Sequence, residues 1–585
     1  MKVSTYLAHK IKKHTNCVFT VPGGGCLEIL HELKKSNVQI IPTLHEQSAV
    51  IAAESYAQYT GNLGVAIVTT GPGGTNGLTG AVSAWLDSVP VLLIAGQVQT
   101  HHLKSQYKGL RQLGFQEVDN KTIYDSVTKN SSIVENIESA TKIIEESIQQ
   151  CTTNRKGPCL VEIPLNIQGA KISQTNIPKA IKKTKIEKKL DIKKVKLAFE
   201  KASRPILLIG NGVRLDGASH LLRSFLQKNK VPTLLTWKAI DLLEETHPCF
   251  VGRPGSVGQR GANINQQKAD LFVSIGARLD HGQTAYNPAN LAPKAKKIIV
   301  DIDKAELNKL PFARSSLLRC SANSFLTYLN NLKLPAYDQW LKACRKIHQH
   351  FPLLSKDSSS SQSNYIDNYY LINRLSTTAT RKEVFVPGSS GASSEITMQA
   401  FIVRKGIRVL NSQGLGAMGF GLPAAIGCAF ANRTNRIILI DGDGGFAMNL
   451  QELTLCEHYN LNIKIFILNN QGYGSIRQSQ NRLFNGIHIG CDEHSGLPLP
   501  NYQNISKAFG LPYTRLRSNK ALNHYIQLMR KHFGPSIAEV LIDPNQTTMP
   551  KTGTIKLPNG RYESLPMDEM LPLIPKADLM KMRDI

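Results

Sequence analysis

Short apolar segments rich in β-branched residues alternate with helical segments along almost all of this chain. In the N-terminal part the apolar segments are CVFTV, GVAIVTT, VPVLLIAG and PCLVEIP, and the helical patterns between them include QSAVIAAESYAQYTG. Strands that alternate with helices pair in parallel, because each connection has to cross a face of the sheet. The pattern therefore predicts an α/β fold built from doubly wound parallel sheets.

The alternation divides the 585 residues into three α/β units. A chain of this length corresponds to roughly three domains at about 100–200 residues each. The low-complexity segment SKDSSSSQSN is the clearest linker between units. We expect three doubly wound parallel-sheet domains over residues 1–175, 190–350 and 365–545, followed by a tail over 546–585 that runs over the surface.

The chain is strongly basic, with 70 Lys and Arg against 43 Asp and Glu and a net charge of +27. Part of the excess is local, since ten lysines lie between Lys179 and Lys201. Apart from Phe199, no aromatic residues or glycines are interleaved there, as a platform for single-stranded nucleic acid requires. We interpret this run as a solvated linker and helix face, and we expect no nucleic-acid partner.

Three further observations concern the compartment and the membrane. The ten cysteines include no CxxC pair, which favours a reducing environment and argues against a disulfide framework or a zinc ribbon. The basic N-terminus lacks the apolar segment of a signal peptide. The uncharged stretch 414–431 is too rich in Gly and Ala for a membrane span and predicts a buried helix. We expect a cytoplasmic protein with no membrane association.

The strongest chemical signal lies in the third unit. A buried strand, RIILIDG, ends at Gly442-Asp443-Gly444, and the next strand, IKIFILNN, ends at Asn469-Asn470. In an open parallel sheet, ligands bind beyond the carboxyl ends of the strands. An Asp carboxylate and an Asn carbonyl are hard oxygen donors suited to Mg²⁺ that also binds a diphosphate. Glycines beside them let backbone N–H groups approach a phosphate.

This pair of motifs resembles the signature of thiamine diphosphate (ThDP) enzymes. The chain resembles the catalytic subunit of acetolactate synthase over nearly its whole length. Four more segments carry the resemblance: HEQSAVIAAESYA, GPGGTNGLTGAVSAWLDSVPVLLIAGQ, GFQEVD and GLGAMGFGLPAAIG. The resemblance implies a pyrimidine-binding domain, a central domain and a diphosphate-binding domain, with ThDP and Mg²⁺ as cofactors.

The resemblance also assigns residues to the coenzyme. Glu46 matches the carboxylate that activates ThDP through its pyrimidine N1′, and Asn76 matches an Asn that positions this carboxylate. Met418 matches the wedge that bends the coenzyme. In the family this Glu serves a coenzyme held by a partner subunit, which implies a homodimer or homotetramer. The ThDP residues implied are Asn76, Ser389, Ser390, Gly416, Met418, Gly442, Asp443, Gly444, Gly445, Asn470 and Gly472. The metal ligands among them are Asp443, Asn470 and Gly472. The loop GSSGASS departs from the usual diphosphate loop of the family.

Other positions match the substrate side of the family's site. Gln97 matches a side chain that polarises substrate oxygens, and Lys129 matches a lysine that assists decarboxylation. An ordinary surface lysine is the alternative for Lys129. The catalytic residues implied are Glu46, Gln97, Lys129, Gly24, Phe115 and Gln116.

The central unit resembles the FAD-binding domain of the family. Gly210-Asn211-Gly212 follows a strand, as a dinucleotide-binding turn does, and Asp301 ends another strand where it can accept from a ribose hydroxyl. The resemblance implies an FAD that takes no part in net redox chemistry. An empty domain is the alternative. The FAD residues implied are Gly210, Gly212, Gly276, Arg278, Asp280 and Asp301.

Two positions depart from acetolactate synthase. Ser479 stands where the family has a Trp that favours the second 2-oxo acid, and Gly282, preceded by His281, stands where it has an Arg that receives the acceptor carboxylate. Charge-assisted contacts of this kind are worth about 1.5–3 kcal/mol. Arg477 is a candidate replacement clamp for an anion, with a structural arginine as the alternative.

We therefore expect a ThDP-dependent decarboxylating carboligase that takes an acetyl-carbanion equivalent from pyruvate, a small 2-oxo acid, to pyruvate or 2-oxobutyrate. This is the acetolactate synthase reaction of branched-chain amino acid biosynthesis, and the resemblance also leaves room for a regulatory subunit. The main alternative keeps the donor and uses a nucleotide-linked keto sugar as acceptor in polysaccharide biosynthesis. A pyruvate oxidase and a non-catalytic protein of the same fold are minor alternatives.

Overall fold

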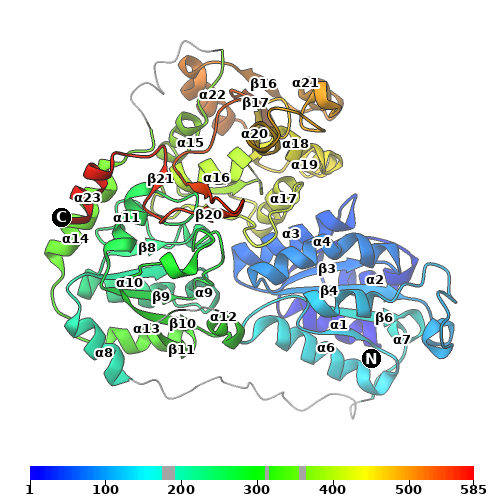
Figure 1. Cartoon of the computed structure of the whole chain (residues 1–585). Coiled ribbons are helices and arrows are strands. Elements are labelled where there is room, and N and C mark those ends of the chain that lie inside the picture. Colours follow the sequence, from blue (N-terminus) through cyan, green and yellow to red (C-terminus); the bar gives the residue numbers. More distant parts are fainter. Residues whose placement is uncertain (174–191, 310–311, 313–314, 355–363, 390, 585) are drawn as a thin grey trace.

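The computed structural model describes residues 1–173, 192–309, 312, 315–354, 364–389 and 391–584. It contains three parallel sheets of six, five and six strands, each flanked by helices, which confirms the predicted fold class. Figure 1 shows the first domain in blue and cyan, the central one in green and the third in yellow and orange. Most of the lysine-rich run, residues 179–191, and linker residues 355–363 lie outside the described residues.

The first sheet has the order β2-β1-β3-β4-β6-β5, and all neighbouring strands are parallel. Because side chains alternate along a strand, Phe19 packs in the core under α3 while Val18 packs in the core under α1 and α2. The strands are β1 (Cys17–Val21), β2 (Gln39–Pro42), β3 (Gly64–Val68), β4 (Val91–Gln97), β5 (Ser131–Ile133) and β6 (Cys159–Pro164). The helices are α1 (Val3–Lys12), α2 (Leu27–Lys35), α3 (Glu46–Thr60), α4 (Pro72–Asp87), α5 (Asn120–Tyr124), α6 (Ile137–Thr152) and α7 (Leu165–Gln168).

The second sheet has the order β11-β10-β9-β7-β8 and is also parallel throughout. Its strands are β7 (Pro205–Ile209), β8 (Thr233–Leu235), β9 (Leu271–Ile275), β10 (Lys296–Asp301) and β11 (Ser315–Arg319). Its helices are α8 (Ile192–Lys201), α9 (Gly212–Leu215), α10 (Ser219–Asn229), α11 (Arg260–Lys268), α12 (Lys304–Asn308), α13 (Ala322–Asn330) and α14 (Asp338–His350).

The third sheet has the order β13-β12-β14-β15-β17-β16, so that β12, β14 and β15 are consecutive neighbours. Its strands are β12 (Glu383–Pro387), β13 (Arg408–Val409), β14 (Arg436–Gly442), β15 (Ile463–Asn469), β16 (Tyr513–Leu516) and β17 (Ser536–Leu541). Its helices are α15 (Asn368–Thr377), α16 (Gly391–Ala400), α17 (Gly421–Ala431), α18 (Asp443–Ala447), α19 (Leu453–His458), α20 (Gly474–Leu483), α21 (Tyr502–Ala508) and α22 (Asn519–Lys531).

The first and third domains share one apolar core. Helices α3 and α17 pack against each other, and residues from both belong to a single buried cluster. The uncharged stretch 414–431 supplies α17, which is buried along almost its whole length, as predicted. Among the helices that the structure describes, none is long and apolar enough to cross a membrane. All ten cysteines are buried and free.

The C-terminal tail lies against the central domain. It contains β18 (Lys551–Thr552), the hairpin β19 (Thr554–Lys556) with β20 (Tyr562–Ser564), β21 (Met570–Leu571) and α23 (Lys576–Asp584). Met567 and Met570 are fully buried, and the Arg260 guanidinium donates to the Met570 carbonyl. Figure 1 shows this red segment beside the green domain. The tail is thus on the surface, as predicted, but anchored by buried side chains.

Candidate active site

Four loops meet at the carboxyl edge of the third sheet. They are residues 388–389 after β12, 414–419 before α17, 442–445 where β14 passes directly into α18, and 470–472 after β15. Close packing joins them: a Cβ added to Gly416 would lie 3.4 Å from the Ser389 carbonyl oxygen, and one on Gly444 would lie 2.2 Å from the Tyr473 ring. The edge where the sequence predicts a magnesium and diphosphate site is therefore a single cluster of glycine-rich loops.

Asp443 is the polar centre of this cluster. Its buried carboxylate accepts the backbone N–H groups of Gly444 at 2.7 Å and Gly472 at 3.0 Å, so the two predicted loops do meet. The Tyr502 hydroxyl donates to the Asp443 carbonyl at 2.6 Å. Burial raises the pKa of Asp443 to about 6. A buried carboxylate with this pKa gains from a divalent cation, because the cation compensates for the lost hydration.

The predicted diphosphate loop offers an unused donor. The Ser389 Oγ is buried and has no hydrogen-bond partner among the described residues, while Ser390 lies outside them. Buried hydroxyls normally find a partner, so this one fits an anionic ligand that it would bind. The residues present thus fit both a diphosphate and its metal ion.

Sequence reasoning missed Asp441, which lies beneath the same loops. A Cβ on Gly388, Gly421 or Gly445 would lie 2.0, 2.3 or 2.8 Å from its carboxylate oxygens. Burial raises the pKa of Asp441 to about 7. An acidic residue near the end of an otherwise apolar strand is the signal that could have identified it.

The first domain presents Glu46 at the start of α3. Glu46 is 8% exposed, and the Asn76 side-chain amide donates to its Oε2 at 3.0 Å. The predicted contact between these two residues is therefore present. His45 caps the helix by accepting from the Gln47 N–H at 3.1 Å.

Glu452, which sequence reasoning also missed, holds the turn that carries Glu46. It belongs to η9 (Leu450–Glu452) of the third domain and accepts the Leu44 N–H at 3.1 Å. Burial raises the pKa of Glu452 to about 7. Nearby, the Ser48 hydroxyl donates to the Asn449 side chain at 3.3 Å. The third domain thus binds the Glu46 turn within the same chain.

Three models of protein domain families match this chain, in the same order as its three domains. The family described as "Thiamine pyrophosphate enzyme, N-terminal TPP binding domain" matches residues 1–123, its central domain matches 192–329, and its C-terminal TPP binding domain matches 389–540. Thiamine pyrophosphate is another name for ThDP. The chain is 32% identical over 553 residues to the acetolactate synthase isozyme 2 large subunit of Escherichia coli (strain K12), covering 94% of this chain and 97% of that protein.

This chain belongs to the thiamine pyrophosphate enzymes. Two further relatives extend the likeness. The acetolactate synthase large subunit of Lactococcus lactis subsp. lactis (strain IL1403) is 29% identical over 567 residues, which are 95% of this chain and 93% of that protein. The chloroplastic acetolactate synthase 1 of Zea mays is 30% identical over 550 residues, which are 91% and 84% of the two chains.

In this thiamine pyrophosphate enzyme, Gln97 is only 1% exposed. Its amide donates to Glu162 at 3.1 Å and to the Val118 carbonyl at 3.1 Å, and its oxygen accepts the Val98 N–H at 2.9 Å. The side chain is therefore held inside the first domain. Sequence reasoning missed Glu162, whose pKa burial raises to about 7.

The remaining predicted substrate-side residues lie at different places. Gly24 begins η1 (Gly24–Cys26), next to the end of β4, where a Cβ on Gly96 would lie 2.0 Å from the Gly25 carbonyl oxygen. A Cβ on Gly71 would similarly meet the Gln116 carbonyl oxygen at 2.0 Å. Phe115 is 86% exposed.

Lys129 lies apart from these residues. Its ammonium donates to the carbonyls of Gln150 and, at 2.9 Å, Thr153. Burial lowers the pKa of Lys129. The side chain lines a cavity shared with the central domain, together with Arg278 and His281. The structure thus places this lysine at a domain junction.

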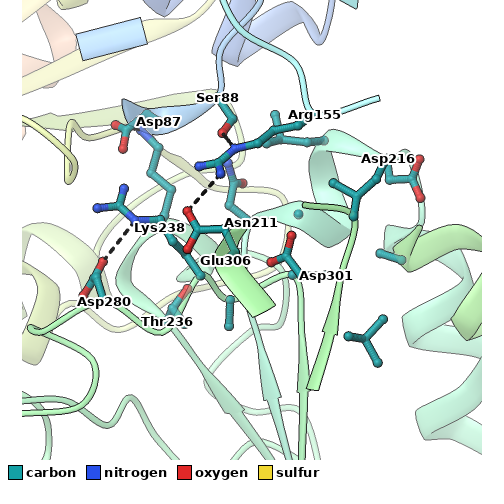
Figure 2. Close-up of a pocket in the computed structure, with 18 of the residues that line it drawn as sticks. Asp87, Ser88, Arg155, Asn211, Asp216, Thr236, Lys238, Asp280, Asp301 and Glu306 are labelled. Carbon is teal, nitrogen blue, oxygen red and sulfur yellow. Dashed lines mark hydrogen bonds and ion pairs between the residues drawn. The ribbon is translucent and has the colours of Figure 1, made fainter. Parts of the chain in front are cut away.

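A cavity of about 630 Å³ lies where all three domains meet, as Figure 2 shows. Of the residues predicted to bind FAD, Gly212, Gly276, Arg278, Asp280 and Asp301 line it. Gly210 packs beneath it, since a Cβ there would lie 2.1 Å from the Gly276 carbonyl oxygen. Burial raises the pKa of Asp301 to about 6.

The first domain closes this cavity with charged groups. The Arg155 guanidinium donates to Ser88 at 3.0 Å and forms ion pairs with Asp303 at 2.6 Å and Glu306 at 2.9 Å. The two ion pairs join the first domain to the central one, and Figure 2 shows Arg155 beside Glu306 in the cavity wall.

Neither of the two positions that depart from acetolactate synthase carries a large side chain. Gly282 lines the three-domain cavity without a side chain, and the Ser479 hydroxyl donates back to the Ser475 carbonyl at 2.9 Å. Arg477 is only 7% exposed and is occupied by protein groups. Of the two alternatives for Arg477, the structure therefore supports the structural arginine, because four of its five N–H groups already have acceptors.

Proposed function

We propose that this thiamine pyrophosphate enzyme is a decarboxylating carboligase that joins an acetyl group from pyruvate to pyruvate or 2-oxobutyrate, as acetolactate synthase does. The buried Asp443 carboxylate, hydrogen-bonded to the loop that carries Asn470 and Gly472, carries the proposal. Bound ThDP supplies a carbon nucleophile that adds to a 2-oxo acid and accepts the electrons released with CO₂.

The residues around the third sheet bind and orient the cofactors. Asp443, the Asn470 side chain and the Gly472 carbonyl would hold Mg²⁺ through oxygen atoms. Ser389 and the Gly445 N–H, near the start of α18, would bind the diphosphate, while the Gly444 N–H is held by Asp443. Gly416 and Met418 lie on the loop that precedes α17 and would hold the pyrimidine.

Glu46 holds and moves a proton at the pyrimidine N1′. Burial and the Asn76 contact fix its carboxyl group in one orientation. We propose that it serves the cofactor of a second copy of the chain, in a homodimer or homotetramer. Several large apolar side chains are exposed on the single chain, and their burial in an interface would support such an assembly. These include Leu44, Phe115, Phe484, Ile487 and Ile489.

The three-domain cavity is proposed to bind FAD without net redox chemistry. Its volume of about 630 Å³ falls in the range of cofactor sites. Asp301 and the Gly212 turn offer the acceptor and the close backbone approach that a dinucleotide needs. The free, buried cysteines support a reducing compartment, and we propose a cytoplasmic enzyme.

A second candidate keeps the donor and takes a nucleotide-linked keto sugar as acceptor. The open positions at Gly282 and Ser479 favour it, because they remove the cation and the aromatic ring that would restrict the acceptor to a small 2-oxo acid.

The test is incubation with pyruvate, ThDP and Mg²⁺, with and without 2-oxobutyrate and keto sugars, followed by mass analysis of the products. Rapid, saturable acetolactate formation supports the first function. Release of CO₂ with efficient transfer only to a keto sugar supports the second. Flavin reduction by pyruvate would indicate an oxidase instead. No ThDP retention and no CO₂ from any 2-oxo acid would contradict both proposals.

A further inference from the structure

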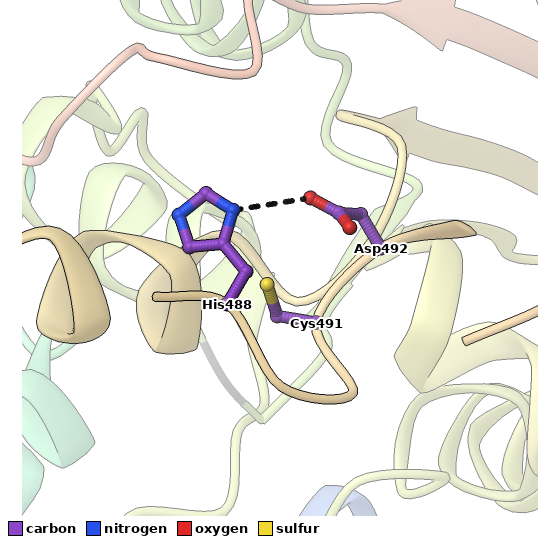
Figure 3. Close-up of side chains that lie close together, drawn as sticks. All are labelled: His488, Cys491 and Asp492. Atoms are coloured by element: carbon purple, nitrogen blue, oxygen red, sulfur yellow. Dashed lines mark ion pairs between the residues drawn. The ribbon is translucent and has the colours of Figure 1, made fainter. Parts of the chain in front are cut away.

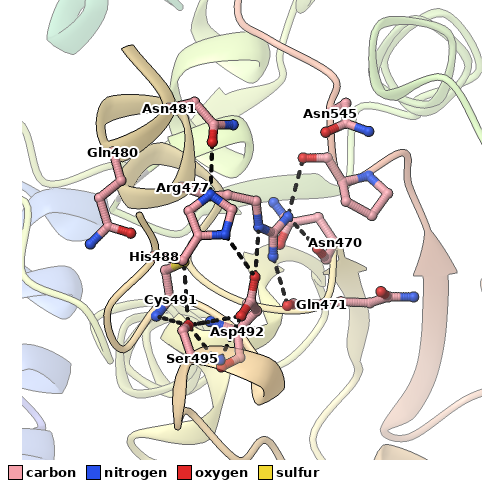
Figure 4. A network of polar contacts seen from close by, with 12 residues as sticks. Asn470, Gln471, Arg477, Gln480, Asn481, His488, Cys491, Asp492, Ser495 and Asn545 are labelled. Carbon is pink, nitrogen blue, oxygen red and sulfur yellow. Dashed lines mark hydrogen bonds and ion pairs between the residues drawn. The ribbon is translucent and has the colours of Figure 1, made fainter. Parts of the chain in front are cut away.

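Arg477 lies in the first turn of α20, directly after the loop that carries Asn470 and Gly472. Its guanidinium donates to the carbonyls of Asn470 at 3.2 Å and Gln471 at 2.8 Å, and to the carbonyl of Pro544 at 3.2 Å. Its Nε donates to the Asp492 carboxylate at 3.3 Å. Figure 4 shows the guanidinium at the centre of this network, with bonds to three separate segments.

The loop 470–472, which Arg477 contacts, has an unfavourable backbone conformation. Gln471 has a φ of 61° and Gly472 a φ of 132°. Left-handed backbone is unfavourable for a residue with a Cβ, so surrounding contacts have to maintain it at Gln471. The bond from Arg477 to the Gln471 carbonyl is one such contact, and the Asn469 side chain accepts the Gln471 N–H at 2.9 Å.

Asp492, at the other end of the network, is also held by hydrogen bonds. The Asp492 carboxylate accepts the Ser495 N–H at 3.0 Å and the Ser495 hydroxyl at 2.7 Å. These bonds, followed by Arg477, hold the pKa of Asp492 below its ordinary value. The Cys491 carbonyl accepts the Tyr473 N–H at 2.8 Å. The segment 491–495 therefore closes back onto the loop 470–473.

We propose that Arg477 is a positioning residue that fixes the loop 470–472, so that the Asn470 side chain and the Gly472 carbonyl face Asp443 before Mg²⁺ binds. This inference rests on the proposed magnesium site. Arg477 acts through the carbonyls of Asn470 and Gln471 and touches neither the metal nor the coenzyme. Groups that orient metal ligands in this way typically contribute 10–100-fold to metal affinity.

A metal-binding role for residues 488–492 is less consistent with the contacts of these residues. His488, Cys491 and Asp492 lie close enough together to hold a metal ion, as Figure 3 shows. The Asp492 carboxylate, however, is already bound by Arg477 and Ser495, and the His488 Nε2 lies 2.7 Å from the Asn481 side-chain oxygen. We therefore assign the carboxylate to the arginine rather than to an ion.

The test measures ThDP binding by the full-length protein in equilibrium dialysis as a function of Mg²⁺ concentration. For Arg477→Ala, the Mg²⁺ concentration at half-saturation should rise by about 10–100-fold. Arg477→Lys should fall in between, because an ammonium cannot span three carbonyls and a carboxylate at once. Asp492→Asn should produce a smaller rise. With Mg²⁺ and ThDP saturating, kcat should return close to the wild-type value, which a general loss of structure would not allow.

Arg482→Ala is the matched control, since Arg482 is an exposed arginine near the end of the same helix. It should leave the Mg²⁺ dependence unchanged. A folded Arg477→Ala protein with wild-type Mg²⁺ dependence would overturn the inference. If that variant does not fold, the Mg²⁺ dependence of Arg477→Lys and Asp492→Asn tests the inference, and wild-type dependence in both would overturn it. Failure of the wild-type protein to bind ThDP at any Mg²⁺ concentration would instead overturn the proposed function.

Discussion

At the scale of single residues, the environment of Asp443 explains how one side chain can organise a site. Its carboxylate accepts N–H groups from both Gly444 and Gly472, so it ties the loop after β14 to the loop after β15. Burial raises its pKa to about 6, because the charged form loses hydration that a bound cation would compensate.

Asp443→Asn should keep the size of the side chain but remove the charge that the cation needs, and it leaves one of the two loop N–H groups without an acceptor oxygen. We expect the Mg²⁺-dependent affinity for ThDP to fall by more than about tenfold. Isothermal titration calorimetry with ThDP and Mg²⁺ measures this directly. Normal affinity in the variant would remove Asp443 from the metal site.

Glu46→Gln separates coenzyme binding from coenzyme activation. The amide keeps the size of the side chain but cannot donate and take back a proton at N1′. We expect ThDP binding to persist while hydrogen exchange at the coenzyme C2 and turnover fall by orders of magnitude. Exchange is measured by NMR in D₂O, with the exposed Glu135→Gln as control. Unchanged exchange would refute the role of Glu46.

At the scale of elements, the contact between α3 and α17 joins the first domain to the third. The backbones approach so closely at Gly427 that a Cβ there would lie 2.2 Å from the Ala52 carbonyl oxygen. Only a glycine permits this approach within a helix. The position of α3, and with it the position of Glu46, depends on this contact.

Gly427→Ala should destabilise the protein, although Ala is the better helix former by about 1 kcal/mol. The overlap with α3 should outweigh that gain by about 1–3 kcal/mol. Thermal unfolding measures the difference. Gly169→Ala is the control, because its Cβ would meet no atom within 4 Å. Equal melting temperatures for both variants would mean that the two helices can separate freely.

Helix α3 also buries Glu54, which gives the stability a defined pH dependence. Burial raises the pKa of Glu54 to about 8, against the influence of Lys238 and with that of Asp87. The unfolded chain releases this proton near pH 4.5, so the stabilising contribution is complete below that pH and is lost as the pH rises through about 8.

Glu54→Gln removes this pH-dependent contribution to the free energy of unfolding. Relative to the wild type, the variant should gain stability as the pH rises from 5 to 9, by up to about 1.4 kcal/mol per pH unit. Melting temperatures of both proteins across this range test the prediction, with Glu135→Gln as an exposed control. A constant difference between wild type and Glu54→Gln would show that Glu54 does not titrate in this range.

At the scale of the whole molecule, one lysine of the central domain holds the three domains together. The Lys238 ammonium contacts Asp87 at 2.7 Å and Gln58 at 2.9 Å in the first domain, and the Asn411 carbonyl in the third. Asp87 also accepts the N–H groups of Gln413 and Gly414, on the loop that leads to Met418.

Lys238→Met keeps the aliphatic stem but leaves the buried Asp87 without its cation. Removing one partner of a buried ion pair destabilises by about 3–5 kcal/mol. We expect a lower melting temperature and faster proteolysis between domains, whereas Lys346→Met, at an exposed position, should change neither. A melting temperature equal to that of the wild type would show that the junction is not held by this pair.

The sequence was most informative where local chemistry and sheet geometry coincide. Asp443 and the loop of Asn470 could be placed together because parallel strands bring their carboxyl ends to one edge. The pairing of Asn76 with Glu46 followed from family resemblance. The buried helix from Gly421 followed from a run of small, uncharged residues.

Other parts of the site could not be predicted from the sequence. Glu452 binds the Leu44 N–H across 408 residues of chain, and Arg477 looks like an open cation until its four acceptors are known. Lys129 was expected to assist decarboxylation, with an ordinary surface lysine as the alternative, and the sequence could not show that its ammonium binds two carbonyls at a domain junction. Such assignments depend on which distant backbone groups lie nearby.

By itself, the sequence determined the three parallel sheets and the chemistry available at their edges, because side-chain alternation, glycine positions and donor types are local properties. The tertiary structure alone decided which charged groups are free to meet a ligand and which are bound to the protein. A charge buried among carbonyls and a charge open to a cavity have the same residue name, and only their surroundings in space determine the free energy of each.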